Sequence, residues 1–283
     1  MNVPAVDSGT RISTGVAGLD TILQGGLAPN RLYLIEGEPG AGKTTLALQF
    51  LLEGRARGER VLYVTLSESA EELSAVVASH GWTLDGIDLF ELAAAEAALS
   101  AEREITLLHP WEIELGETVK LITDEAERTR AARVVFDSLS EMRLLAQDAL
   151  RFRRQILALK QFFAGRGTTV FLLDDLLSNR TGQDQHLRSL CHGVVTLERL
   201  TRDFGSARRR LEVSKMRGAP FQEGWHDYAI RRGTTPSDAA AWMFFLAWML
   251  QIITSHSSAQ RCRAGWRSWM SCSMADRCAA PAR

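Results

Sequence analysis

A short glycine-rich segment, GEPGAGKTT at residues 37–45, constrains the fold more than any other part of the sequence. It fits the phosphate-binding pattern G-x-x-x-x-G-K-[ST], with a predicted strand at 31–37 before it and a predicted helix at 43–58 after it. The glycines let backbone N–H groups converge on phosphate oxygens, because an inward Cβ would block them. The alternative is a glycine-rich turn with an incidental lysine. The flanking strand and helix favour the phosphate site, since a helix N-terminus attracts an anion.

The predicted ligands of this segment are ATP and Mg²⁺. In the pattern, the ammonium group of Lys43 contacts the β- and γ-phosphates, and the hydroxyl of Thr44 binds Mg²⁺. The residues predicted to hold the nucleotide are Gly37, Glu38, Pro39, Gly40, Ala41, Gly42, Lys43, Thr44 and Thr45.

A second metal ligand is predicted from the apolar run RVVFDSL at 133–139, which indicates a buried strand. Asp137 stands near the end of that strand, where its carboxylate would hold Mg²⁺ through water. A lone aspartate at a strand end is more often a turn residue. The phosphate-binding segment favours the metal role here.

Hydrolysis also requires a group that orients or deprotonates water. Glu68 follows a predicted strand at 60–66 and is the candidate for this role. It also precedes a predicted helix at 69–81, which begins with Ser69 as N-cap and Glu72 as its capping-box partner. The alternative is therefore that Glu68 is only a favourable acid near a helix N-terminus.

Strand and helix patterns alternate from residue 10 to about 232. Alternation of continuous apolar strands with helices predicts an α/β fold, with a mainly parallel sheet covered by helices on both faces. Two late strands are predicted to be antiparallel at one edge of that sheet. The further expected elements are helices at 117–132 and 147–166 and strands at 168–175, 193–199 and 209–216.

Charge, cysteine spacing and the first residues limit the classes of partner, metal site and location that the sequence predicts. The formal net charge is −1, which gives no electrostatic case for nucleic acid or an anionic membrane across the whole chain. The four cysteines form no C-x-x-C pair, and neither a zinc site nor a disulfide framework is expected. The first residues contain no apolar signal region, so a cytoplasmic protein is the expectation.

The last fifty residues differ from the rest. No Lys or Glu follows Thr234, although four of the seven Trp lie there. The apolar run at 239–253 is too short to favour a membrane span. We therefore expect an ATPase domain at 1–233 and an atypical Trp- and Cys-rich tail at 234–283. A frameshifted gene end and a divergent extension are both open interpretations of that tail.

Several blocks carry a family resemblance. RISTGVAGLDTILQGGL precedes the phosphate-binding segment, and YVTLSES, VVFDSLSE and LEVSKMRGAPFQEGWHDYAI follow it in order. Over about residues 10–232 the sequence resembles the KaiC-type domains of the RecA-like P-loop ATPases. The resemblance implies a RecA-like core and a homo-oligomer, with a hexameric ring favoured and ATP bound between neighbours. It also implies that Lys215 and Arg217 reach the γ-phosphate of the adjacent subunit. A solvated edge strand is the alternative for these two cations.

Three departures limit what the resemblance implies. Ser67 and Glu68 stand where the clock members have paired acids, the chain has one phosphate-binding segment, and the tail differs. The favoured function is an ATP-hydrolysing switch that signals to an unnamed protein partner. A DNA-stimulated RecA-like ATPase is an alternative, although the loop at 176–193 offers two Arg and no stacking aromatic. An ATP-binding scaffold with little turnover is another, and serine/threonine autokinase activity is not favoured.

Overall fold

Strands and helices alternate along the chain in the computed structural model, which describes residues 11–94, 110–146, 148–176, 187–201, 207–231 and 242–244. All of them belong to one compact unit that ends at Phe244. The strands are β1 (Leu32–Gly37), β2 (Val61–Thr65), β3 (Asp88–Glu91), β4 (Arg133–Asp137), β5 (Thr169–Asp175), β6 (Gly193–Leu200), β7 (Arg208–Met216), β8 (Trp225–Ile230) and β9 (Trp242–Phe244). The helices are α1 (Ala17–Ile22), α2 (Lys43–Ala56), α3 (Ala70–Ser79), α5 (Pro110–Thr129), α6 (Leu139–Ala146) and α7 (Ala149–Ala164).

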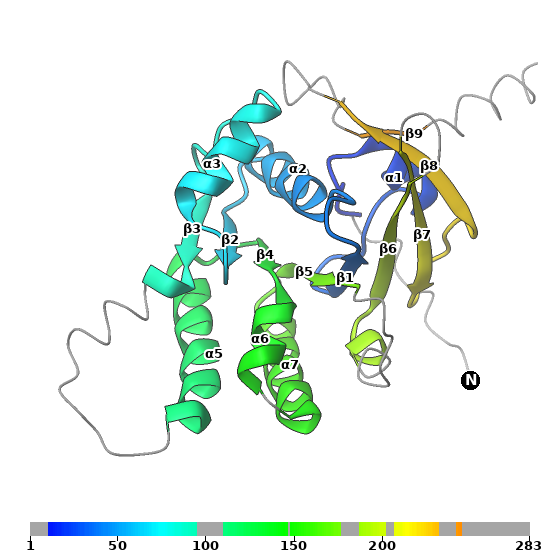
Figure 1. Cartoon of the computed structure of the whole chain (residues 1–283). Coiled ribbons are helices and arrows are strands. Elements are labelled where there is room, and N and C mark those ends of the chain that lie inside the picture. The colour runs from blue at the N-terminus through cyan, green and yellow to red at the C-terminus, as the bar shows by residue number, and fades with distance from the viewer. Residues whose placement is uncertain are drawn as a thin grey trace, which may run out of the picture. The chain divides into compact units, whose positions relative to one another are not determined.

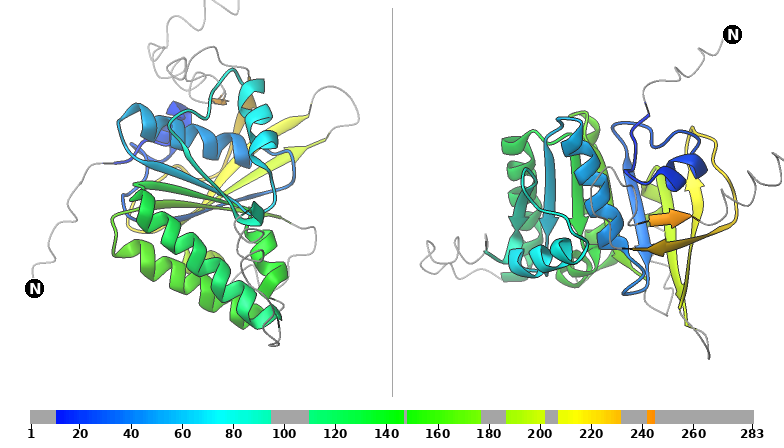
Figure 2. Two further views of the ribbon diagram at one scale, coloured as in Figure 1. Left: turned by 90° about the vertical axis from the view of Figure 1, so that its left-hand side faces the viewer. Right: turned by 90° about the horizontal axis from the view of Figure 1, so that it is seen from above.

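The described strands form a single nine-stranded sheet in the order β3-β2-β4-β5-β1-β6-β7-β8-β9. The strands from β3 to β6 are parallel, and β7, β8 and β9 continue the sheet antiparallel. Helices cover both faces of the parallel part, with α2 and α3 on one face and α5, α6 and α7 on the other (Figures 1 and 2). The predicted fold, a mainly parallel sheet with an antiparallel edge, is therefore confirmed.

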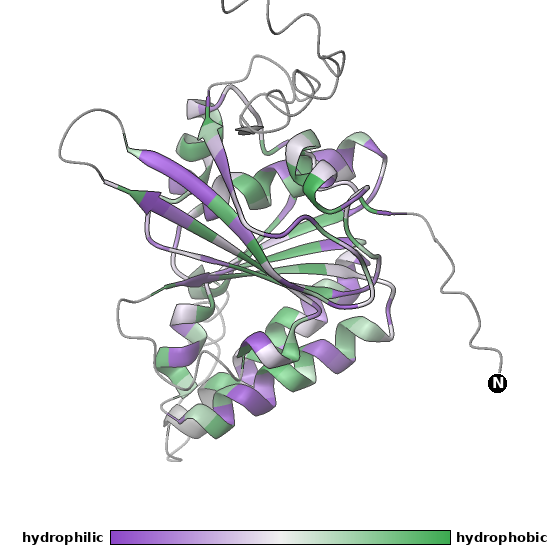
Figure 3. Cartoon of the chain, turned by 90° about the vertical axis from the view of Figure 1, so that its right-hand side faces the viewer, coloured by the Kyte–Doolittle hydropathy of each residue, from purple (hydrophilic) through white to green (hydrophobic). Residues whose placement is uncertain are grey.

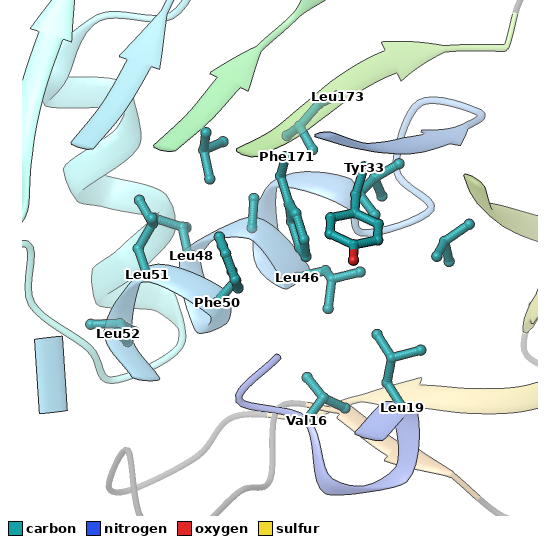
Figure 4. Packing of buried hydrophobic residues seen from close by; sticks show 14 of the residues in the cluster. Val16, Leu19, Tyr33, Leu46, Leu48, Phe50, Leu51, Leu52, Phe171 and Leu173 are labelled. Carbon is teal, nitrogen blue, oxygen red and sulfur yellow. The ribbon is translucent and has the colours of Figure 1, made fainter. Parts of the chain in front are cut away.

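The central strands β1, β4 and β5 are buried along almost their whole length, because each of their faces meets a layer of helices. In β1, Tyr33 and Ile35 belong to the core shared with α1, α2 and α3, whereas Leu32 and Leu34 belong to the core shared with α5, α6 and α7. In the first core, the ring of Phe50 stacks on that of Phe171 with their centroids 4.0 Å apart (Figure 4). Figure 3 shows hydrophobic strands at the centre of the sheet and hydrophilic stretches on the antiparallel strands.

Local hydrogen bonds and two glycines shape the segment that precedes β1. The carboxylate of Asp20 accepts hydrogen bonds from the hydroxyls of Ser13 and Thr14 and from the backbone N–H of Thr14. Gly15 and Gly26 have φ values of 80° and 104°. A Cβ at Gly26 would lie 2.4 Å from the carbonyl oxygen of Ile12. Only glycine fits both the conformation and the space there.

A buried arginine fixes this N-terminal segment to the core. The side chain of Arg133, at the start of β4, is fully buried and forms an ion pair with Glu59 at 2.5 Å. The Arg133 guanidinium also donates to the carbonyl oxygens of Ser13 and Phe50, at 2.8 and 2.9 Å. It lies 4.7 Å from the centroid of the Phe50 ring.

The predicted element boundaries are mostly close to the observed ones. The capping box of α3 is confirmed, with Ser69 accepting from the Glu72 N–H and Glu72 accepting from the Ser69 N–H. Strand β4 ends at Asp137 rather than 139, because α6 begins at Leu139. Helix α5 begins at Pro110 rather than at residue 117. The sequence prediction omitted α1, α6, β3, β8 and β9, which are short or lie partly on the surface.

The described residues reach only the start of the atypical tail. Trp242–Phe244 pairs antiparallel with β8 as the last strand of the sheet. The boundary expected at residue 233 stays a prediction, because residues 232–241 lie outside the described part, as do residues 245–283. Among the described helices, none has the length and apolar character needed to cross a membrane.

Candidate functional site

The predicted phosphate-binding segment joins β1 to α2. Gly37 is the last residue of β1, and a Cβ there would lie 2.5 Å from the carbonyl oxygen of Leu197. Gly40 and Gly42 have φ values of 76° and 105°, which side-chain-bearing residues rarely adopt. The hydroxyl of Tyr228 in β8 donates to the carbonyl of Ala41 at 2.6 Å. The loop therefore presents backbone at the N-terminus of α2, a geometry that suits an anion.

Lys43 begins α2 and is 8% exposed. Its ammonium group donates to the carbonyl oxygens of Gly37 and Glu38, at 2.9 and 3.1 Å, and lies 2.7 Å from the carboxylate of Asp175. Asp175 ends β5 and is opposite Gly37 in the register of the sheet. The sequence analysis missed Asp175. Its position at the end of the predicted strand 168–175, equivalent to that of Asp137 on β4, was an available signal.

Asp137 and Thr44, the two predicted Mg²⁺ ligands, are in direct contact. The hydroxyl of Thr44 donates to Oδ2 of Asp137 at 3.0 Å, and the hydroxyl of Tyr63 donates to the same oxygen at 2.5 Å. Burial raises the pKa of Asp137 above that of an ordinary carboxyl group, and these hydrogen bonds partly offset the rise. No sequence signal pointed to Tyr63, because a tyrosine within an apolar strand is typical of a core.

The oxygen ligands at this site fit Mg²⁺. A threonine hydroxyl and a carboxylate are hard oxygen donors, and Mg²⁺ in nucleotide sites is held by one or two protein groups together with phosphates. Within the described ranges, no group of three or more His, Cys, Asp or Glu residues is arranged to hold a metal ion. Thr44 and Asp137 are the residues that would hold the cation of a bound nucleotide.

Glu68 lies in the loop between β2 and α3. The hydroxyl of Thr65 donates to its carbonyl oxygen at 2.7 Å and accepts from its N–H at 3.0 Å, which fixes the backbone of the loop. Oε2 of Glu68 is buried and has no hydrogen-bond partner among the described residues. Burial raises the pKa of Glu68, and repulsion from Asp137 and Glu72 raises it further. Such a carboxylate is suited to accepting a proton.

Three carboxylates thus lie along the carboxyl edge of the parallel strands. Asp175 ends β5, Asp137 ends β4 and Glu68 follows β2, in the order in which these strands extend from β1. In open α/β sheets, ligands bind at this edge. Of the remaining predicted residues, Glu38 and Pro39 are exposed, and the hydroxyl of Thr45 lies 3.4 Å from Nε2 of His80.

Lys215 and Arg217 lie near the amino-terminal ends of the parallel strands, opposite the carboxyl ends where the phosphate-binding loop lies. Met216 pairs with Gly193, which pairs with Tyr33 near the start of β1, four residues before Gly37. The ammonium group of Lys215 donates to the carbonyl oxygen of Cys191 at 2.8 Å, and Arg217 donates to that of Ser189 at 2.9 Å. The structure therefore does not bring these two cations to the phosphate-binding loop of their own chain.

Comparison with known proteins identifies relatives of this fold and site. The family model described as KaiC ATPase matches residues 12–235. UPF0273 protein PH0284 of Pyrococcus horikoshii is 31% identical over 228 residues, which cover 78% of this chain and 90% of that protein. The circadian clock oscillator protein KaiC of Picosynechococcus is 28% identical over 245 residues, which cover 85% of this chain and 44% of that protein.

A solved structure has the same fold. It is a KaiC-like protein, PH0186, from Pyrococcus horikoshii, which superposes with a TM-score of 0.66. The superposition covers 83% of this chain and 99% of that chain at 22% sequence identity. At this identity the likeness concerns the fold alone.

Proposed function

This chain belongs to the KaiC ATPase family, and from that premise we propose that it binds ATP with Mg²⁺ and hydrolyses the ATP. The observation that supports this most strongly is the arrangement of Thr44, Asp137 and Glu68 at the carboxyl edge of the sheet. The Thr44 hydroxyl is hydrogen-bonded to Asp137. Near them lies a buried carboxylate oxygen of Glu68 that has no hydrogen-bond partner in the described part of the chain.

Each residue has a definite role in this proposal. The loop at 37–42 binds the phosphates through backbone N–H groups, and Lys43 neutralises charge on them. Thr44 and Asp137 hold Mg²⁺, which when bound neutralises charge that develops on the phosphates. Glu68 orients the attacking water and accepts its proton, a role that its raised pKa supports.

We also propose that the site is completed by a second copy of the chain. Lys215 and Arg217 lie at the edge of the sheet opposite their own phosphate-binding loop, so they cannot act on a nucleotide bound there. In a ring, a heterologous contact would place them beside the loop of the neighbour, and a hexamer is the favoured closure. Turnover would then depend on assembly. The role as a switch that signals to a protein partner stays a prediction, and so does the cytoplasmic location.

The alternatives differ in what they require. A DNA-stimulated ATPase would use the loop at 176–193, of which residues 177–186 lie outside the described part. A scaffold with little turnover is favoured by Ser67, which is exposed and supplies no second carboxylate beside Glu68. Autokinase activity has no specific supporting observation.

The experiment that tests the proposal is ATP turnover per chain as the concentration of full-length protein rises in the presence of Mg²⁺. A per-chain rate that increases and saturates supports a site shared between subunits. A constant, measurable rate retains hydrolysis and rejects the shared site. Nucleotide binding without turnover supports the scaffold. Lys43→Met, prepared identically, serves as the control for contaminating ATPases, and stimulation by single-stranded DNA would favour the second alternative.

A further inference from the structure

Tyr63 is a buried tyrosine in the middle of β2 whose hydroxyl is aimed at the candidate metal ligand. Its side chain is 0% exposed, and its hydroxyl donates to Oδ2 of Asp137 at 2.5 Å. The strands themselves create this contact, because β2 and β4 are neighbours and Tyr63 pairs with Val135, two residues before Asp137.

The hydroxyl of Thr44, from α2, donates to the same carboxylate oxygen at 3.0 Å. Tyr63 and Thr44 both use Oδ2, so neither of them occupies Oδ1. Two donors on one oxygen restrict rotation of the Asp137 carboxylate about its Cβ–Cγ bond. Because the Thr44 hydroxyl donates its proton to Asp137, the lone pairs of that hydroxyl are available for a cation.

The other tyrosines show that this partner is not a general requirement of burial. The hydroxyls of Tyr33 and Tyr228 donate to backbone carbonyl oxygens, those of Ala28 and Ala41. Tyr63 donates instead to a carboxylate. A phenol is protonated at neutral pH, so its hydroxyl can donate to that carboxylate.

We propose that Tyr63 is a positioning residue, which together with Thr44 holds the Asp137 carboxylate in the orientation that binds the divalent cation of a bound nucleotide. The inference rests on the proposed function for the binding of a metal–nucleotide complex, but not for its hydrolysis. Groups that orient metal ligands typically contribute about 10- to 100-fold to metal affinity. The competing explanation is that Asp137 merely satisfies a buried hydroxyl.

The test uses Mn²⁺ as the probe, in the presence of saturating ADP, with free Mn²⁺ measured by electron paramagnetic resonance. Tyr63→Phe removes one hydroxyl and keeps the ring. Tyr33→Phe is the matched control, because it also removes a buried tyrosine hydroxyl from a central strand but leaves Asp137 untouched. We expect Mn²⁺ affinity to fall by about tenfold in Tyr63→Phe and to stay unchanged in Tyr33→Phe. ADP affinity in EDTA should be the same in all three proteins.

Asp137→Asn provides a second, independent measurement. If Tyr63 acts through Asp137, adding Tyr63→Phe to Asp137→Asn should cause no further loss of Mn²⁺ affinity. Additive losses, or equal Mn²⁺ affinity in wild type and Tyr63→Phe, would overturn the proposal. So would a Tyr63→Phe protein that loses ADP affinity in EDTA, because that would indicate general damage.

The outcomes separate this inference from the proposed function. A wild-type protein that binds Mn²⁺ with ADP but does not hydrolyse ATP would end the hydrolysis proposal. The role of Tyr63 would still stand on the affinity difference. A wild-type protein that binds no Mn²⁺ with ADP would overturn both.

Discussion

The ammonium nitrogen of Lys43 lies 2.7 Å from Oδ1 of Asp175, so the cation of the phosphate-binding loop is already paired with an acid of its own chain. Lys43 is nearly buried, and Asp175 is about one-third exposed. Triphosphate binding must therefore compete with this carboxylate for the ammonium group, and it must also approach a negative charge.

This pair predicts that Asp175→Asn binds ATP more tightly than wild type. A partly exposed ion pair is worth about 1 kcal/mol, which corresponds to a roughly fivefold lower Kd. Isothermal titration with ATP and Mg²⁺ measures the change. Asp227→Asn, which removes one carboxylate from the exposed pair with Arg208, is the charge-matched control and should bind as wild type does. Weaker binding by Asp175→Asn would show that the carboxylate assists the nucleotide instead.

Glu68→Gln should reduce kcat for ATP hydrolysis by about 100-fold with little change in the Kd for ATP, since a general base acts in the reaction and not in binding. Steady-state kinetics and a binding titration separate the two. Glu71→Gln changes an exposed neighbouring acid and should have no effect. In wild type, the rate should fall as the pH falls through the raised pKa of Glu68, because the protonated carboxyl cannot accept a proton. Equal rates for Glu68→Gln and wild type would remove Glu68 from the mechanism.

Mixing two inactive variants tests whether Lys215 and Arg217 act on a neighbouring subunit. Glu68→Gln and Arg217→Ala should each be nearly inactive alone. When equal amounts exchange subunits, roughly a quarter of the interfaces would combine an intact Glu68 with an intact Arg217, and turnover should recover accordingly. The measurement is ATP turnover before and after mixing, with each variant mixed with itself as the control. No recovery despite demonstrated exchange would contradict a site shared between subunits.

Arg133→Met should destabilise the fold. Loss of one partner of a buried ion pair costs about 3–5 kcal/mol, and the partial exposure of Glu59 places the expected cost near the lower end. Two backbone carbonyls would also lose their donor. Urea denaturation measures the free energy of unfolding. Arg57→Met removes an arginine from the exposed i,i+4 pair with Glu53 and should cost about 0.5 kcal/mol or less. Similar losses in both variants would argue against a special role for Arg133.

The lowered pKa of His192 predicts that the stability of the fold depends on pH. Burial and nearby cations lower its pKa to about 4 in the folded chain, and its Nδ1 accepts from the N–H of Leu32. Below its unfolded pKa, near 6.5, the unfolded chain takes up a proton that the folded chain does not, so this contribution to stability is lost as the pH falls from 6.5 toward 4. His192→Asn keeps an acceptor at that position and should lessen the loss in urea titrations across this range. An unchanged pH dependence would contradict the prediction.

The sequence determined the elements whose signals are local. A strand, a glycine-rich loop and a helix at 31–58 follow from residue order, because backbone freedom at glycine and helix N-terminus chemistry act over a few residues. The capping box at Ser69 is equally local. The alternation of strands and helices predicted the class of sheet, and the family resemblance supplied the ring hypothesis. Short elements such as β3 and α6 escaped prediction, since few residues give them little periodicity.

Tertiary structure alone decided the contacts across strands. Asp175 meets Lys43 because β5 is inserted between β1 and β4, and Tyr63 meets Asp137 because β2 is the other neighbour of β4. The register of β6 and β7 places Lys215 and Arg217 at the edge away from their own loop. Strand order and register arise from the packing of two whole helical layers on the sheet, and no short segment carries that information. The sequence therefore determined the residues available to the site, and the folded sheet determined which of them meet.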